Sequence, residues 1–305
     1  MVPGRQSRAG SSDDRGKGIV RLSQEQYCND VLKRFQMSDC TPVDTPCEAN
    51  LHLAASDSPP LDKRDVNVVH NYQQLIGACM YLTCFTRGDC SFAVNRCARF
   101  MSNPVPTHIA AAKRILRYLA GTRSLGVTYR RGAVDPSLLS IGMETGPNQL
   151  STSADADHAG ADDRRSVSGW ASMLAGAMIA WSSKRQPVTA ISSIESEFYS
   201  VSQCALDCVY LRRIMQLLGY EQTVPTLIAQ DNNTCIFLVK GSSMYARAKL
   251  IDTRVHWHLV REFAAGDKPE VKLYQIACEY QLADIFTKGL PRVAFQRNHR
   301  TLMGE

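Results

Sequence analysis

The feature that most constrains the fold is a change of pattern near residue 148, after which short apolar segments alternate with helical ones. Three strands, a helix, a strand, helices, a strand and a last helix predict one mixed sheet with helices packed on it, which is an α/β fold. The turn-like sequence "LAGAM" should join the second and third strands as a hairpin. The expected strands are 149–156, 168–175, 178–184, 225–231 and 271–277, and the expected helices are 193–218, 232–240, 253–265 and 280–288.

The part of the chain before residue 131 has a different, mainly helical organisation. Residues 1–18 are Gly, Ser and charged residues without periodicity and should be disordered. A short strand, "GIVRLS", should lead into a helix, "QEQYCNDVLKRF", and a Pro-punctuated extended arm should follow. Further helices are expected at 70–85, 89–102 and 106–120. The chain is therefore expected to divide into four segments: a disordered start at 1–18, a mainly helical part at 19–135, the α/β part at 147–291 and a C-terminal helix or tail at 292–305.

Composition narrows the class of protein only a little. The chain has 305 residues, 44% of them hydrophobic, and a formal net charge of +6, which fits a polyanionic partner. Eleven cysteines without a C-x-x-C pair favour reduced thiols and an intracellular protein. No apolar run approaches the length that spans a membrane. Cys204 with Cys208, and His256 with His258, lack the spacing of zinc ligands, and small buried hydrophobic positions are the better interpretation of the cysteines.

The acidic stretch "SADADHAGADDRR", residues 153–165, has three interpretations: a calcium loop, a solvated turn, or a strand end that brings a carboxylate to a metal. A calcium loop starting at Asp155 would need ligands at its fifth and twelfth positions, which are Ala159 and Ser166, so this interpretation fails. A solvated turn suits Asp162 and Asp163, because arginines follow them directly. Asp155 is different because it ends a predicted strand.

Three other acids occupy comparable positions: Glu197 early in the long helix, Asp231 after a buried strand, and Asp284 in "QLADIFTK". Four carboxylates near one sheet edge would repel one another unless cations neutralise them. Two Mg²⁺ ions about 4 Å apart, or Mn²⁺ in their place, would do so and would create a site that cleaves phosphodiesters. Spacing alone leaves this as one arrangement among several.

Longer motifs carry a resemblance to a known family. "SADADHAG", "DDRRSVSG", "IAWSSKRQP", "SSIESEFY", "AQDNNTCIFLV" and "EYQLADIFTKGLP" occur in this order. Together they resemble the ribonuclease H domain of copia-type LTR retrotransposon Pol polyproteins. Upstream, "QLIGACMYLTCFTRGDCSFAVNRCARFMSNPVPTHIAAAKRILRYLAGT" looks like the C-terminal, thumb-like part of the family's reverse transcriptase. The resemblance covers about residues 19–304.

The resemblance implies a ribonuclease H-like fold, a mixed five-stranded sheet with flanking helices, preceded by a mainly helical reverse-transcriptase tail. It implies hydrolysis of the RNA strand of an RNA–DNA hybrid, and the remaining Pol domains as partners. The family's metal-binding acids fall on Asp155, Glu197, Asp231 and Asp284, whereas Glu195 matches a position better suited to capping the helix. No Tyr-x-Asp-Asp polymerase motif is present, so this chain should not synthesise DNA.

Two positions depart from the family pattern. His158 replaces the tryptophan of S-D-A-D-W-A-G, and Leu250 replaces the histidine of K-H-I-D. A mobile histidine assists product release in related nucleases, and either His256 or His258 could take that place, or both could lie on a solvated helix face.

Basic residues are candidates for binding the hybrid because phosphates dominate nucleic-acid affinity. The candidates are Lys113, Arg114, Arg117, Lys184 and Arg185, with Asn232 as a group suited to a 2′-hydroxyl. An ordinary solvated helix face is the alternative for the first three. The alternative for the whole chain is a catalytically silent nucleic-acid-binding remnant of a polyprotein, or a relic that does not fold alone.

Overall fold

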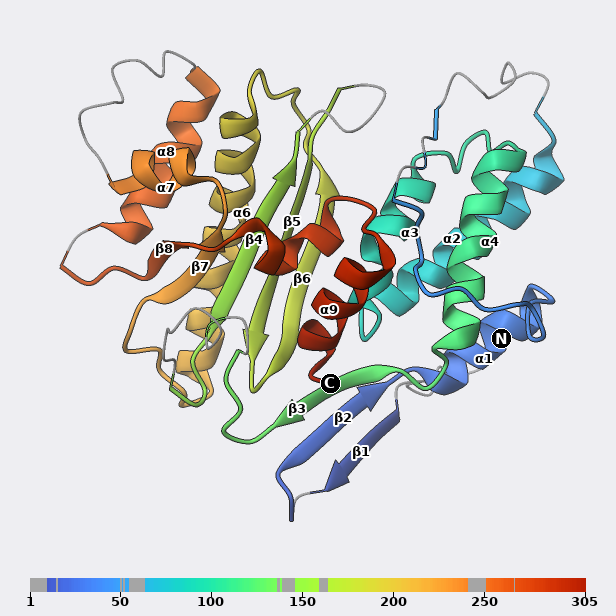
Figure 1. Cartoon of the computed structure of the whole chain (residues 1–305), viewed down its shortest axis with the longest axis horizontal. Coiled ribbons are helices and arrows are strands. Elements are labelled where there is room, and N and C mark those ends of the chain that lie inside the picture. Colours follow the sequence, from blue (N-terminus) through green and yellow to red (C-terminus); the bar gives the residue numbers. More distant parts are fainter. Residues whose placement is uncertain are drawn as a thin grey trace. The chain divides into compact units, whose positions relative to one another are not determined.

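A computed structural model gives the fold of two compact units, each described here by itself (Figure 1). The helical unit comprises Met1–Thr128 and Gly289–Gln296, and the sheet unit comprises Tyr129–Lys288 and Arg297–Glu305. The residues that the structure describes are 10–14, 16–49, 51, 53–54, 64–135, 138, 146–158, 164–240, 251–265 and 267–305.

Four α-helices build most of the helical unit: α1 (Glu25–Arg34), α2 (Val66–Thr83), α3 (Ser91–Ala98) and α4 (Pro106–Gly121). Helix α2 begins four residues earlier than the sequence pattern predicts. The cause is a cap, since the Asp65 carboxylate accepts hydrogen bonds from the amides of Asn67 and Val68 at 2.9 and 3.3 Å. Helix α3 ends at Ala98, short of the predicted residue 102.

The predicted disorder of residues 1–18 is wrong for part of that stretch. Gly10–Asp14 forms strand β1, which pairs antiparallel with β2 (Ile19–Ser23), and β3 (Gly126–Arg130) completes a three-stranded sheet in the order β1-β2-β3. Composition misses β1 because backbone pairing to a neighbouring strand, rather than apolar side chains, holds it in place.

A buried polar network lies inside the helical unit. Arg87, 1% exposed, donates from Nε and Nη2 to the two carboxylate oxygens of Asp89 at 3.1 and 3.0 Å. The Tyr118 hydroxyl donates to the same carboxylate at 2.7 Å, and Arg87 also donates to the carbonyl and hydroxyl oxygens of Thr122. Every charge in the network therefore has a partner, which is the condition for keeping an ion pair inside a core.

The sheet unit is built on five strands in the order β6-β5-β4-β7-β8. Strand β5 pairs antiparallel with both β4 and β6, while β4 with β7 and β7 with β8 are parallel, so the sheet is mixed. The hairpin between β5 and β6 turns at Ala175 and Gly176, whose φ angles of 52° and 81° suit a tight two-residue turn. The bounds are β4 Ser151–Asp157, β5 Val167–Leu174, β6 Ala177–Arg185, β7 Thr226–Gln230 and β8 Val271–Gln275.

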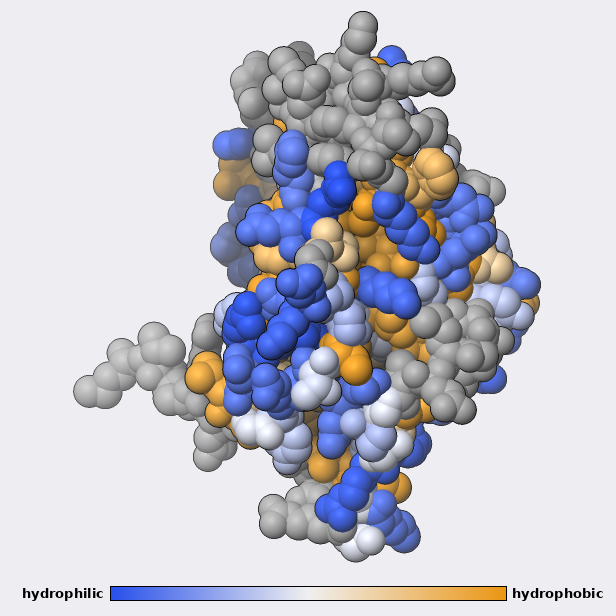
Figure 2. Space-filling view, turned by 90° about the vertical axis from the view of Figure 1, so that its left-hand side faces the viewer, coloured by the Kyte–Doolittle hydropathy of each residue, from blue (hydrophilic) through white to orange (hydrophobic). Residues whose placement is uncertain are grey.

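Helices α6 (Ser193–Leu217), α7 (Asn233–Lys240) and α8 (Ile251–Ala264) pack on the sheet through one apolar core. Figure 2 views the side of the molecule where α7 and α8 lie, and its described residues mix hydrophilic with hydrophobic ones. Helix α9 (Arg292–Met303) ends the chain. Among the described residues, no helix combines the length and apolar character that crossing a membrane requires.

The α/β fold with a mixed five-stranded sheet is confirmed, and every strand lies within two residues of its predicted bounds. The predicted helix at 280–288 is wrong. Two short 3-10 turns, Cys278–Tyr280 and Leu282–Phe286, occupy that segment. Gln281 separates them because its backbone is extended (φ −68°, ψ 103°), and its side chain caps the second turn at the Ala283 amide.

Candidate metal centre

Three of the four predicted acids converge at one end of the sheet. Asp155 lies on β4, the central strand, and Asp231 follows β7, its parallel neighbour, so the carboxyl ends of the two strands bring these side chains together. Glu197 comes from the first turns of α6, which packs against β4. Each side chain offers an oxygen, and these oxygens lie within 4.8 Å of one another. Asp155 is 3% exposed and Glu197 is 7% exposed.

The start of α6 separates the roles of two glutamates. The Ser192 hydroxyl accepts a hydrogen bond from the Glu195 amide at 3.2 Å, and the Glu195 carboxylate accepts one from the Ile191 amide at 2.6 Å. Glu195 therefore caps the helix, as the S-x-x-E spacing predicts. Glu197, two residues later, faces the sheet.

Three buried glutamines hold the segments that carry the acids. Gln230 donates to the Glu197 carboxylate at 3.2 Å. Gln186 donates to the carbonyl of Ser196 at 2.9 Å, and Gln281 donates to the carbonyl of Ala154 at 3.0 Å. Because buried amides lose free energy when unpaired, these contacts fix the backbone on which the carboxylates are mounted.

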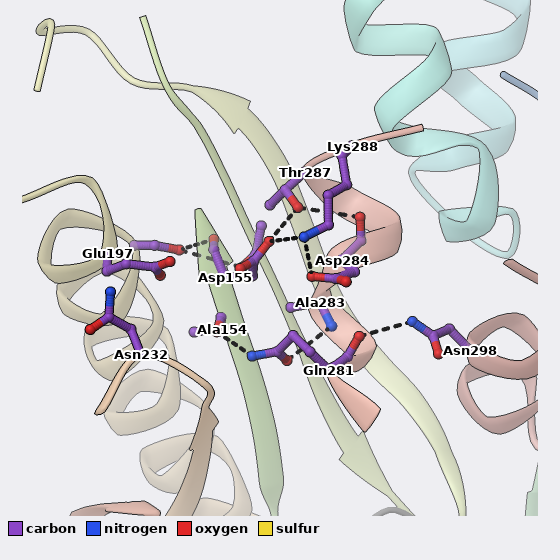
Figure 3. Close-up of polar contacts among 12 residues, drawn as sticks. Ala154, Asp155, Glu197, Asn232, Gln281, Ala283, Asp284, Thr287, Lys288 and Asn298 are labelled. Atoms are coloured by element: carbon purple, nitrogen blue, oxygen red, sulfur yellow. Dashed lines mark hydrogen bonds and ion pairs between the residues drawn. The ribbon is translucent and has the colours of Figure 1, made fainter. Parts of the chain in front are cut away.

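Asp284 reaches the site from the second 3-10 turn and contacts it through a lysine (Figure 3). Lys288 Nζ lies 2.8 Å from Asp284 Oδ1 and 3.8 Å from Asp155 Oδ2. The hydroxyl of Thr287 donates to Asp155 Oδ2 at 2.5 Å. Asp284 is thus adjacent to Asp155 but is not one of the three acids whose oxygens cluster.

Burial and mutual repulsion disfavour the charged forms of these acids. Burial, then the charges of Asp155 and Asp231, raise the pKa of Glu197 to about 9. Burial and Asp155 likewise raise the pKa of Asp284 to about 7, although Lys288 opposes the shift. Burial lowers the pKa of Lys288, but Asp155 and Asp284 raise it more, so the ammonium form prevails. The cluster therefore retains a proton or requires a cation, and its hard oxygen donors fit Mg²⁺ or Mn²⁺.

Gly169 permits the close approach of the segment that carries Asp284. It pairs with Asp155 in the β4–β5 register, and a Cβ atom there would lie 2.6 Å from Thr287 Cγ2 and 2.7 Å from Phe286 Cβ. We expect Gly169→Ala to lower the free energy of unfolding by about 1–3 kcal/mol, because the added methyl overpacks this contact. Urea denaturation measures the change.

Gly77→Ala is the matched control for this substitution. Gly77 lies inside α2, and a Cβ atom there would meet nothing within 4 Å. The same methyl should therefore stabilise the chain, by about 0.5–1 kcal/mol through helix propensity. Equal effects of the two substitutions would contradict the steric argument.

The three basic residues of α4 predicted to bind nucleic acid make different contacts within the chain. Arg114 donates to the Glu48 carboxylate at 2.9 Å and to the Thr45 hydroxyl at 3.1 Å. Arg117 donates to the carbonyl of Thr41 at 2.7 Å. Both guanidinium groups thus hold the segment 41–48, the start of the predicted extended arm, against α4. Lys113 lines a pocket of about 410 Å³ in the helical unit. A role for these residues in binding nucleic acid stays a prediction.

In the sheet unit, Lys184 and Arg185 are exposed at the end of β6, as a contact with the sugar-phosphate backbone of a nucleic acid would require. The Asn232 side chain accepts a hydrogen bond from the Cys235 amide at 3.1 Å and so caps α7. Cys204 and Cys208 lie in the apolar core, which agrees with their interpretation as small buried residues. Asp162, Asp163, Leu250 and the side chain of His256 lie outside the described residues and side chains, whereas His258 is exposed on α8.

Sequence reasoning misses Thr287 and Lys288, which contact the acids directly. The signal was present, because both residues belong to the "ADIFTK" motif and follow Asp284 by three and four positions. It also misses Gln186, Gln230 and Gln281, although each belongs to one of the motifs that carry the resemblance.

Comparison with known proteins gives relatives over most of the chain. The Pol polyprotein of transposon TNT 1-94 from Nicotiana tabacum is 34% identical over 277 residues, 90% of this chain and 19% of that polyprotein. That of transposon RE1 from Arabidopsis thaliana is 34% identical over 91% of this chain and 17% of its own length. The secreted RxLR effector protein 161 of Plasmopara viticola is 38% identical over 46% of this chain and 90% of its own length. The chain thus spans less than a fifth of the two polyproteins.

No protein-family model matches the chain. Ribonuclease H1 from the archaeon Halobacterium salinarum aligns with a TM-score of 0.34 and 10% identity, over 46% of this chain and 94% of that protein. The N-terminal ribonuclease H domain of a Mycobacterium tuberculosis protein aligns with a TM-score of 0.35 and 11% identity, over 50% and 97%. At such scores the alignments carry no argument about this chain. Over about nine-tenths of its length the chain is homologous to copia-type retrotransposon Pol polyproteins.

Proposed function

We propose that the sheet unit is a ribonuclease H that hydrolyses the RNA strand of RNA–DNA hybrids with two divalent metal ions. The observation that carries the proposal is the convergence of Asp155, Glu197 and Asp231, whose oxygens lie within 4.8 Å of one another although three separate elements supply them. Buried carboxylates in such a group are costly unless a cation joins them. The name that the polyprotein relatives share fits an element that copies RNA into DNA and so produces hybrids.

The residues that would hold the metal are the three clustered acids together with Asp284. When bound, divalent cations would offset the negative charge that builds up on the phosphodiester during hydrolysis. The chain's own contribution is to keep the oxygen donors in fixed positions: Gln230 orients Glu197, and Thr287 orients Asp155. Such preorganisation removes the cost of rearranging the site during the reaction.

Contacts to the hybrid would come from the exposed ends of the same unit. Lys184 and Arg185 offer charge for phosphates, and the amide of Asn232, which lies beside Glu197 in Figure 3, suits a 2′-hydroxyl. The contact of Asn232 with a 2′-hydroxyl would distinguish a hybrid from a DNA duplex, which has no 2′-hydroxyl on either strand.

The test is hydrolysis of a labelled RNA–DNA hybrid by the full chain in Mg²⁺, with DNA and RNA duplexes of the same sequence as controls. We expect cleavage of the hybrid's RNA strand only, and its loss when EDTA removes the metal. Salt-dependent binding of the hybrid without cleavage, in both Mg²⁺ and Mn²⁺, would instead identify a catalytically silent binding remnant.

A further inference from the structure

Lys288 places a positive charge among the acids of the candidate site. Its Nζ lies between Asp284 and Asp155, at 2.8 and 3.8 Å from the nearest oxygen of each, as Figure 3 shows. The Asp155 side chain is buried at 4% exposure and that of Asp284 is partly buried at 14%, whereas the lysine side chain is 42% exposed. The ammonium group of Lys288 is thus a cation that joins these two acids.

Asp155 belongs to two groups of acids at once. On one side it clusters with Glu197 and Asp231, which can hold a first divalent ion. On the other it shares Lys288 with Asp284. A second ion held by Asp155 and Asp284 would have to enter the space between them where the ammonium group lies, 2.8 Å from Asp284 Oδ1 and 3.8 Å from Asp155 Oδ2. Mg²⁺ binds oxygen at about 2.0–2.1 Å, so the ion and the ammonium group would claim the same position.

We propose that Lys288 is a resident counter-cation that competes with the second divalent ion for Asp155 and Asp284. The inference rests on the proposed function and concerns the order in which that site fills. An ammonium group and a divalent ion repel each other strongly at such separations, so both cannot stay between the same two carboxylates. The exposed, flexible stem of Lys288 lets the ammonium group withdraw towards solvent when the ion enters.

A purely structural role for the Lys288–Asp284 salt bridge predicts the opposite effect of removing the lysine on the affinity for the second ion. If Lys288 only held Asp284 in position, removing the lysine would misplace that carboxylate and lower the affinity for the second ion. If Lys288 competes with the ion, removing the lysine frees the position between the two carboxylates and raises the affinity for the second ion. The sign of one change in affinity therefore separates the two roles.

The experiment is a calorimetric titration of the full, substrate-free chain with Mn²⁺ at constant ionic strength. We expect the wild type to bind one ion more tightly than a second. In Lys288→Met the dissociation constant of the second ion should fall on the order of tenfold or more, while that of the first ion should change by less than about twofold. Lys288→Arg keeps the charge and should keep the second ion weak. Lys272→Met removes an exposed lysine of β8 in the same unit and should match the wild type.

A second ion that is unchanged or weaker in Lys288→Met would overturn the proposal, provided that circular dichroism shows a native melt; Lys288→Gln serves if the methionine variant does not fold. First-ion binding is judged separately with Asp155→Asn. If the wild type binds an ion that Asp155→Asn abolishes, the metal site of the proposed function stands whatever Lys288 does. If no ion binds the wild type, both the site and the competition are refuted.

Discussion

Replacing Asp155 with asparagine should lower the rate of RNA hydrolysis in an RNA–DNA hybrid by about a thousandfold or more. Asp155 is the acid shared by the clustered oxygens and by the Lys288 and Asp284 pair, so its charge serves the whole site. Loss of one shared ligand removes several kcal/mol of charge stabilisation, and each 1.4 kcal/mol is a factor of about ten in rate. Initial rates on a labelled hybrid, at saturating Mg²⁺, measure the loss.

Two controls keep this result interpretable. Glu195→Gln changes a carboxylate only two residues from Glu197 but alters a helix cap, so we expect it to keep the rate within about tenfold of wild type. Asp207→Asn changes a half-buried acid further along α6 and should leave the rate alone. A native melt for Asp155→Asn shows that the chain still folds, since asparagine has the same shape. Near-wild-type hydrolysis by that variant would remove the proposed mechanism.

Asp89→Asn should lower the free energy of unfolding of the helical unit by about 3–5 kcal/mol. Asp89 and Arg87 are 2% and 1% exposed and are joined by two hydrogen bonds. The substitution leaves the guanidinium charge buried without its counter-charge and weakens the acceptor of the Tyr118 hydroxyl. Urea denaturation followed by far-UV circular dichroism measures the loss.

The two units can be followed separately in this experiment. The three tryptophans, Trp170, Trp181 and Trp257, all belong to the sheet unit, so tryptophan fluorescence should shift less than the circular dichroism signal. The matched control is Glu48→Gln, which breaks the ion pair of Arg114 with a carboxylate 57% exposed and should cost less than about 1 kcal/mol. If Asp89→Asn lowers the free energy of unfolding no more than Glu48→Gln does, the buried Arg87–Asp89 pair contributes little to stability.

The sheet was predictable because its strands alternate with helices and end at turn residues that local chemistry dictates. Asp155 near the end of a predicted strand and Asp231 directly after another made it possible from sequence that the two acids meet at one edge of the sheet, and the family motifs singled them out. Glu197 followed from its place beside the apolar face of α6. In each case the signal is local, within one element and its ends.

What the sequence did not reveal depends on contacts between distant segments. Arg114 and Arg117 have the spacing of a solvated basic face, but their partners lie about 70 residues earlier in the chain. The segment after β8 has a helical pattern, yet the cap from Gln281 and its bond to Ala154 turn it into 3-10 structure. Strand β1 needs β2, and composition does not report pairing.

The arginines that hold the extended arm against α4 bear on how binding should respond to ionic strength. Each phosphate neutralised on duplex DNA contributes about 0.9 to the slope of log affinity against log salt, and a guanidinium already engaged by its own chain adds less to that count. Arg114 and Arg117 are engaged in this way. Arg114, whose charge is paired with Glu48, should therefore contribute less to counterion release than an unpaired arginine on the same helix would.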